Sequence, residues 1–83
     1  MNTNKPPPNA VSDSALNHQE GGRHYADMAI QPVQFIHANN LGFFEGNVVK
    51  YVSRHRVKNG VQDLLKARHY IDLLIELEQA KPV

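Results

Sequence analysis

The sequence predicts an all-α protein, with a small three-helix domain behind a disordered N-terminal tail. Three observations predict this fold. Apolar residues in the second half of the chain recur at steps of three and four, no segment shows the alternation of a strand, and proline, glycine and asparagine stand where helices should start and stop. The 83 residues suffice for one small domain.

The first 23 residues hold three of the five prolines and two of the five glycines. Their large apolar side chains are too few to offset the entropy of ordering the segment. We therefore expect a flexible tail over residues 1–23 and a helical domain over residues 24–83. The "KPPP" stretch at residues 5–8 is either a linker or a polyproline ligand for a partner.

Pro32 suits the first turn of a helix, and "NNLG" at residues 39–42 is a stop signal. A second helix is expected from Phe43 or Phe44 to about Val57. Gly46, in its first turn, indicates close approach of another helix or of a ligand. The spacing predicts that this helix faces inward through Phe44, Val48, Tyr51, Val52 and His55.

A third helix is expected to run to about Ala80. Asn59 is the predicted N-cap, with Gln62 as its capping-box partner and Asp63 in the first turn. The apolar residues of this helix cover more surface than one helical hairpin can bury. We therefore expect a helical homo-oligomer.

The chain has no cysteine, which fits a reducing compartment, and it shows neither the apolar core of a signal peptide nor a membrane-length apolar run. We expect a cytoplasmic protein without a membrane partner. The net charge is only +1, but residues 43–69 carry six basic against two acidic residues. This imbalance favours an anionic ligand, although it is also common in ordinary helices.

Five residues of the second helix form what we call the basic stripe: Asn47, Lys50, Tyr51, Arg54 and Lys58. Lysine and arginine side chains bind phosphate, an amide reads a base or sugar edge, and a tyrosine ring stacks on a base. The same spacing also describes a solvated face in which Arg54 pairs with an acid.

Asp63 lies on the same face of the third helix as Ala67 and Tyr70. It is therefore predicted to point toward the second helix, and a buried carboxylate needs a partner. Arg54 and Lys50 are the candidates. The pair is either a salt bridge between helices, or a functional group in which Asp63 orients Arg54 or holds Mg²⁺ beside a phosphate, with Glu45 as a second metal ligand.

The sequence lacks a G-x-x-x-x-G-K-[ST] phosphate loop, since "GFFEGN" at residues 42–47 does not end in Lys-Ser/Thr. The five histidines lack the spacing of a zinc site. Conventional phosphate-loop and zinc chemistry are therefore not expected.

Four segments carry a family resemblance: "HY" (24–25), "IQP" (30–32), "LGFFEGNVVKYVSRHRVKNG" (41–60) and "DLLKARHYIDLLIE" (63–76). In order and spacing they resemble the SaV-like family of small bacteriophage proteins, often described as phage nucleotide kinases. The resemblance implies a phage protein in the host cytoplasm that binds nucleotides. It further implies phosphoryl transfer to deoxynucleoside monophosphates with Mg²⁺ and without the usual phosphate loop.

The resemblance extends to nine polar positions: His24, Tyr25, Asn47, Lys50, Tyr51, Arg54, Lys58, Asp63 and Lys66. Lys50, Arg54 and Lys58 would hold phosphates, and Asn47 and Tyr51 would contact sugar or base. Tyr25 and Lys66 are further substrate-binding candidates. His24 would transfer a proton, and Asp63, with Glu45, would position Mg²⁺ or the arginine.

Two alternatives stay open. The protein could bind without turnover, sequestering nucleotides or nucleotide defence signals or blocking a host protein. It could instead bind nucleic acid through the basic stripe, which predicts steep salt dependence and a preference for polymer over mononucleotide.

Overall fold

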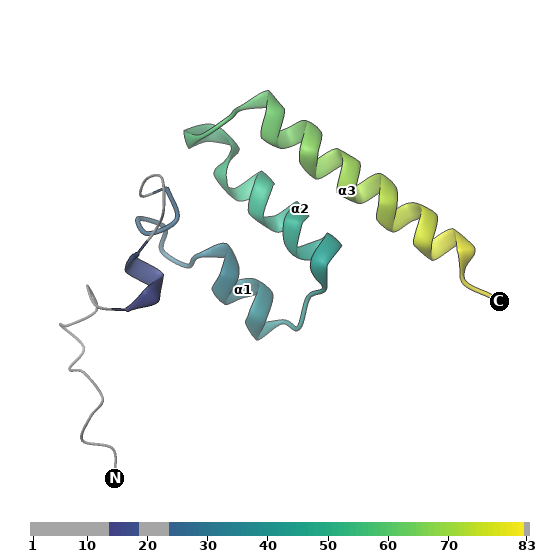
Figure 1. Cartoon of the computed structure of the whole chain (residues 1–83), viewed down its shortest axis with the longest axis horizontal. Helices are drawn as coiled ribbons and strands as arrows, with labels where there is room; N and C mark the ends of the chain where they lie inside the picture. The colour runs from purple at the N-terminus through teal and green to yellow at the C-terminus, as the bar shows by residue number, and fades with distance from the viewer. Residues whose placement is uncertain (1–13, 19–23, 83) are drawn as a thin grey trace, which may run out of the picture.

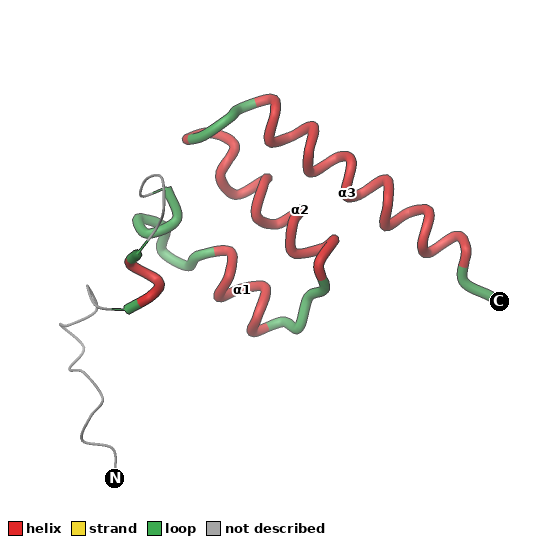
Figure 2. The backbone as a smooth tube through the Cα atoms, viewed as in Figure 1, coloured by secondary structure: helices red, strands yellow, loops and turns green. Residues whose placement is uncertain are grey.

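A computed structural model describes residues 14–18 and 24–82 of the chain. The described residues form three α-helices, with short 3₁₀ turns and without strands: η2 (Ala15–Asn17), α1 (Pro32–Ala38), α2 (Phe43–Arg54), η3 (His55–Val57) and α3 (Val61–Ala80) (Figures 1 and 2). The predicted all-α, three-helix fold is confirmed.

Most of the expected tail lies outside the described residues. Residues 14–18 are described, and they contain the 3₁₀ turn η2, in which the Ser14 hydroxyl accepts a hydrogen bond from the Leu16 N–H. The Gln31 side-chain amide donates to the Leu16 carbonyl, so this turn is tied to the start of α1. The boundary between tail and domain stays a prediction.

The three helices lie in a single layer with α2 in the middle (Figure 1). Helix α2 packs against both α1 and α3, whereas α1 and α3 do not contact each other. Helix α3 has 20 residues, which corresponds to about 30 Å, and its C-terminal half extends past α2. Such a layer leaves two broad faces of α2 and α3 uncovered.

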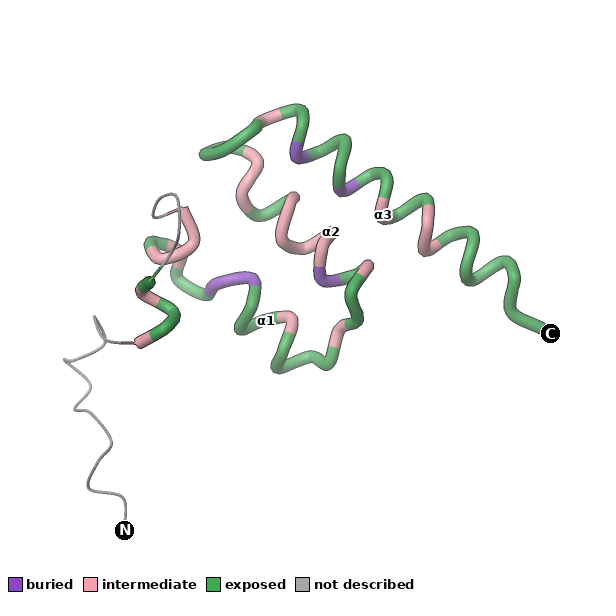
Figure 3. The backbone as a smooth tube through the Cα atoms, in the orientation of Figure 1, coloured by how far each residue is buried: buried purple, intermediate pink, exposed green. Residues whose placement is uncertain are grey.

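The layer has almost no apolar interior, as the burial colours of Figure 3 show. Among the described residues, the buried apolar side chains are Ala67 and Pro32. Val52 was expected to face inward, but it is 45 % exposed, so this prediction is wrong. The periodicity identified an apolar face of α2 correctly, but the described residues form no second layer that covers that side of the helix.

Close packing of α1 on α2 depends on Gly46. A Cβ atom at this position would lie 3.3 Å from Cγ2 of Ile36, closer than ordinary van der Waals contact. The glycine therefore lets α1 approach the backbone of α2, as expected for the helix-contact alternative.

The start of α3 differs from the prediction. Its N-cap is Gly60, in the left-handed region at φ 54°, and not Asn59. Asn59 instead donates from its backbone N–H (3.3 Å) and its side-chain amide (3.4 Å) to the Asp63 carboxylate. The Asp63 carboxylate in the first turn thus holds the residue that precedes the N-cap, and no side chain forms a cap hydrogen bond at Gly60.

Candidate functional site

The centre of the site is an ion pair that joins α2 to α3. Arg54 Nε donates to Asp63 Oδ2, and Arg54 Nη2 donates to Asp63 Oδ1, each at 3.1 Å. This is the two-pronged geometry in which arginine binds a carboxylate most specifically. The predicted partnership of Asp63 with Arg54 is confirmed.

Both members of the pair are shielded from water. The Asp63 side chain is 0 % exposed and the Arg54 side chain is 12 % exposed. Burial would raise the pKa of Asp63, but the hydrogen bonds from Arg54 and Asn59 outweigh it and hold the pKa below its usual value. The carboxylate is therefore ionised at neutral pH, and both of its oxygens accept hydrogen bonds inside the protein.

Arg54 also holds the N-terminal part of the domain. Its Nη1 donates to the Tyr25 hydroxyl at 3.0 Å, so the guanidinium connects α2, α3 and the segment before α1. The hydrogen bond to Asp63 and the one to Tyr25 raise the pKa of Arg54. All three nitrogens of the guanidinium are engaged. The geometry thus gives Arg54 a structural role, and its contact with a phosphate stays a prediction.

Three cations surround the Tyr51 ring. Lys50 Nζ lies 4.6 Å, Arg54 Cζ 4.8 Å and Lys66 Nζ 5.4 Å from the ring centroid, all within the range of cation–π attraction. We call Lys50, Arg54, Lys66 and the Tyr51 ring the cation cluster. Tyr51 also stacks on Tyr70 of α3, with centroids 6.1 Å apart and planes 13° apart.

Charge in the cation cluster is only partly balanced. Asp63 neutralises Arg54, but neither Lys50 nor Lys66 forms an ion pair with any residue in the part of the chain that the structure describes. An open hollow of about 400 Å³ beside Tyr51 and Lys66 exposes this side of the cluster. The two ammonium groups are thus available to an anion.

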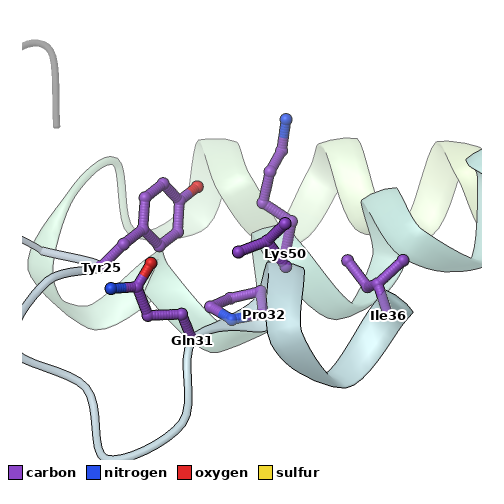
Figure 4. A pocket seen from close by; sticks show the side chains of 6 residues that line it. Tyr25, Gln31, Pro32, Ile36 and Lys50 are labelled. Atoms are coloured by element: carbon purple, nitrogen blue, oxygen red, sulfur yellow. The ribbon is translucent and has the colours of Figure 1, made fainter. Parts of the chain in front are cut away.

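A pocket of about 240 Å³ lies on the α1 side of Lys50. We call it the apolar pocket; Tyr25, Gln31, Pro32, Val33, Ile36 and Lys50 line it. In Figure 4 the Tyr25 ring stands at one end and Ile36 at the other, and the Lys50 ammonium points away from Pro32. The stem of Lys50 thus lines the pocket, while its ammonium belongs to the cation cluster.

The remaining predicted residues lie around these two features. His24 contacts Tyr25, with ring centroids 4.5 Å apart. Burial, and then the positive charges of Lys58 and Arg54, lower the pKa of His24, so the imidazole is neutral at pH 7. Lys58 is exposed at the end of η3. It is not one of the three cations at the Tyr51 ring.

Asn47 and Glu45 serve the first turns of α2. The Asn47 amide donates to the Phe43 carbonyl at 2.8 Å, and Glu45 Oε1 accepts from the Gly42 N–H at 2.6 Å. Asn47 lines an open hollow that it shares with Lys50. Glu45 is the exposed cap of its own helix, and no contact joins it to Asp63.

The expected Mg²⁺ site does not fit these residues. No three acidic or histidine side chains of the described residues gather in a way that suits a metal ion. Both Asp63 oxygens already accept hydrogen bonds, and the side chain is fully buried. Neither Glu45 nor Asp63 is therefore placed as a metal ligand, and Asp63 acts as the orienting partner of Arg54.

Sequence reasoning did not find the apolar pocket. Gln31, Pro32, Val33 and Ile36 line it from the start of α1, where the sequence shows a helix start and a few apolar residues. The signal in the sequence that could have pointed to this pocket was the "IQP" segment at residues 30–32, which is part of the family resemblance. Tyr70 was also missed as a partner of Tyr51, because its spacing assigned it simply to the packed face of α3.

These features define a small helical protein in which a buried ion pair supports an exposed cation cluster beside an apolar pocket. A model of a family of proteins of unknown function, DUF3310, matches residues 19–72, and the chain belongs to this family. The match includes every predicted site residue. No curated protein and no solved structure matches the chain. None of the helices formed by the described residues is long and apolar enough to span a membrane.

Proposed function

We propose that the protein binds a nucleotide, with the base or sugar in the apolar pocket and the phosphate at the cation cluster. The observation that carries this proposal is the position of Lys50. Its stem lines the apolar pocket, and its ammonium lies 4.6 Å from the Tyr51 ring centroid. A ligand that fills the pocket and extends along this side chain meets positive charge.

The phosphate side of the proposal rests on Lys50 and Lys66. Their ammonium groups lie on the same tyrosine ring and lack acidic partners among the described residues. Each binds a phosphate oxygen as a point charge. Arg54 contributes indirectly, because its ion pair with Asp63 fixes α2, which carries Lys50, against α3, which carries Lys66.

The base side rests on the walls of the apolar pocket. Tyr25 offers a ring, and Pro32 and Ile36 offer flat apolar surface (Figure 4). Gln31 and the Tyr25 hydroxyl are the polar groups at its edge. Small-molecule pockets typically enclose about 300–1,000 Å³, so this smaller pocket suits a base or a sugar and leaves the phosphate outside.

Turnover is the finer part of the proposal, and the resemblance to phage nucleotide kinases supports it. His24 has the chemistry for a proton acceptor, because its lowered pKa keeps it neutral at pH 7. The proposed acceptor is a deoxynucleoside monophosphate. Binding without product formation in the presence of Mg²⁺ and ATP would leave the nucleotide-binding proposal intact and remove the kinase activity.

Calorimetric titration tests the binding proposal. The full chain is titrated with dTMP, dGMP, ATP and a short oligonucleotide, with Mg²⁺, at low and moderate salt. We expect saturable binding of a mononucleotide. Silence for all mononucleotides, with steeply salt-dependent binding of the oligonucleotide, would contradict the proposal and indicate a nucleic-acid-binding face.

Lysine variants assign the phosphate contact. Lys50→Gln and Lys66→Gln should each weaken mononucleotide binding about tenfold or more, because a hydrogen bond to a charged group contributes about 1.5–3 kcal/mol. Lys81→Gln is the matched control, since it removes one positive charge from an exposed side chain beyond the end of α3. Equal losses in all three variants would indicate only a general effect of net charge.

A further inference from the structure

Helix α3 carries a second apolar surface that the described chain leaves uncovered. The side of α3 that packs on α2 contains Asp63, Ala67, Tyr70 and Leu74, at steps of four, three and four. One position further along are Leu64, Arg68, Ile71, Ile75 and Glu78, which we call the outer stripe. Since one position turns a helix by about 100°, the outer stripe is a separate surface beside the packed one.

All five residues of the outer stripe are exposed. The exposed fractions are 39 % for Leu64, 41 % for Ile71 and 47 % for Ile75. Three branched apolar side chains in a row on one helix form a patch that soluble proteins usually cover. The single layer of helices offers nothing to cover it, because α1 does not reach α3.

The outer stripe lies on the face of the layer opposite the cation cluster. Lys66 precedes Ala67 by one position, whereas Arg68 follows it by one position. The two residues therefore lie on opposite sides of the surface that packs on α2. A partner seated on the outer stripe leaves Lys50, Lys66 and the Tyr51 ring open to a ligand.

The order of residues in the outer stripe identifies the partner. Successive residues of the stripe are separated by three, four and three positions, in the order Arg68, Ile71, Ile75 and Glu78. The spacing is the same from either end, with a positive charge at one end and a negative charge at the other. An antiparallel copy of α3 therefore matches this surface in both shape and charge.

We propose that two copies of the chain pair through the outer stripes of antiparallel α3 helices, crossing near the level of Leu73. In this register Ile71 meets Ile75 of the second copy, and Arg68 meets Glu78 of the second copy. The two-fold axis repeats each contact, as an isologous dimer requires. The second copy supplies the second layer that a helical domain needs to bury its apolar face.

Glu78 also has a partner within its own chain, but this contact is too weak to prevent the proposed pair with Arg68 of the second copy. Lys81 Nζ lies 2.9 Å from Glu78 Oε2, and the two side chains are 65 % and 67 % exposed. Exposed pairs of this kind contribute about 0–1 kcal/mol. Glu78 is thus able to turn toward Arg68 of the second copy, and Lys81 can remain beside it.

Charge reversal tests both the dimer and its register. We expect the full wild-type chain to sediment as a dimer, and Arg68→Glu or Glu78→Arg to raise the dimer Kd about tenfold or more, because each places like charges together twice. The double variant Arg68→Glu/Glu78→Arg should dimerise again. An equimolar mixture of the two single variants should form a heterodimer, since each repulsive set then meets its opposite.

Several outcomes would overturn the proposal. The wild-type chain could be monomeric at the highest soluble concentration, or it could assemble in a way that neither charge reversal weakens. The mixture of the two single variants could also fail to associate. Circular dichroism on each variant establishes that the helices are retained, which is expected because both positions are exposed. Mononucleotide titration of Arg68→Glu separates the two proposals, because the cation cluster lies on the other face and its binding should be unchanged.

Discussion

Arg54→Met, which removes the charge and keeps much of the side-chain volume, should unfold a large fraction of the protein. In this variant the Asp63 carboxylate stays at 0 % exposure without its charged partner. Removing one member of a buried pair costs about 3–5 kcal/mol. We expect the lower end of this range, because the two hydrogen bonds from Asn59 remain.

This loss is large for a domain of this size. Small proteins have a free energy of unfolding of about 5–15 kcal/mol. A domain whose described residues bury little apolar surface beyond Ala67 and Pro32 belongs at the low end of this range. The variant should therefore lose most of its stability. Asp63→Asn should cost less, because one acceptor oxygen remains for the guanidinium.

Urea unfolding followed by circular dichroism at fixed protein concentration measures the effect. Arg56→Met is the matched control, since Arg56 is exposed two positions further along, and it should change the free energy of unfolding by less than about 0.5 kcal/mol. The double variant Arg54→Met/Asp63→Leu should recover much of the loss, because no buried charge then lacks a partner. A loss below about 1 kcal/mol in Arg54→Met would refute the assignment of a structural role to the pair.

Three further outcomes follow from the described geometry. Gly46→Ala should change stability little, because the gain of about 1 kcal/mol in helix propensity offsets the cost of a shift of Ile36. Gly46→Leu should instead separate α1 from α2 and lower stability. Urea unfolding of both variants checks this. Gly60→Ala should cost about 1–3 kcal/mol in the same assay, because the backbone has φ 54° although the space around it is open. Stability should fall as the pH drops below 6.5, since the pKa of His24 is lowered in the folded chain and the unfolded chain takes up the proton first. Stability should fall again below pH 3.8, the usual pKa of an aspartate, because the pKa of Asp63 is also lowered. In a pH series of unfolding curves, His24→Asn should remove the first decline.

Local signals in the sequence were sufficient to predict the helices and the ion pair. Pro32 begins α1, and α3 ends at Ala80. The spacing of Asp63 with Ala67 and Tyr70 placed its carboxylate toward α2, where Arg54 was one of two cations in reach. These predictions succeeded because each depends on helix periodicity, which is a property of the sequence alone.

The predictions that failed depended on which surfaces meet. Val52 has the spacing of an inward residue, but the side of α2 that it occupies is uncovered. Asn59 has the identity of a helix cap, but its side chain donates to Asp63, and Gly60 takes the N-cap position. The availability of Arg54 to phosphate could not be judged either, because Arg54 donates a hydrogen bond to Tyr25, which lies 29 positions away in the sequence.

The arrangement also explains why lysines, and not the arginine, are the proposed phosphate ligands. The ion pair uses the guanidinium fork to fix α2 against α3, so Arg54 brings a charge to Tyr51 that Asp63 already balances. Lys50 belongs to α2 and Lys66 to α3, and both reach the same ring from helices that this pair holds together. The backbone positions from which the two lysines extend are therefore set by the fold before a ligand arrives, and a phosphate that binds there does not have to order the helices. Loss of Arg54 would weaken binding through this geometry even without a direct contact, whereas loss of either lysine would weaken binding with the helices intact.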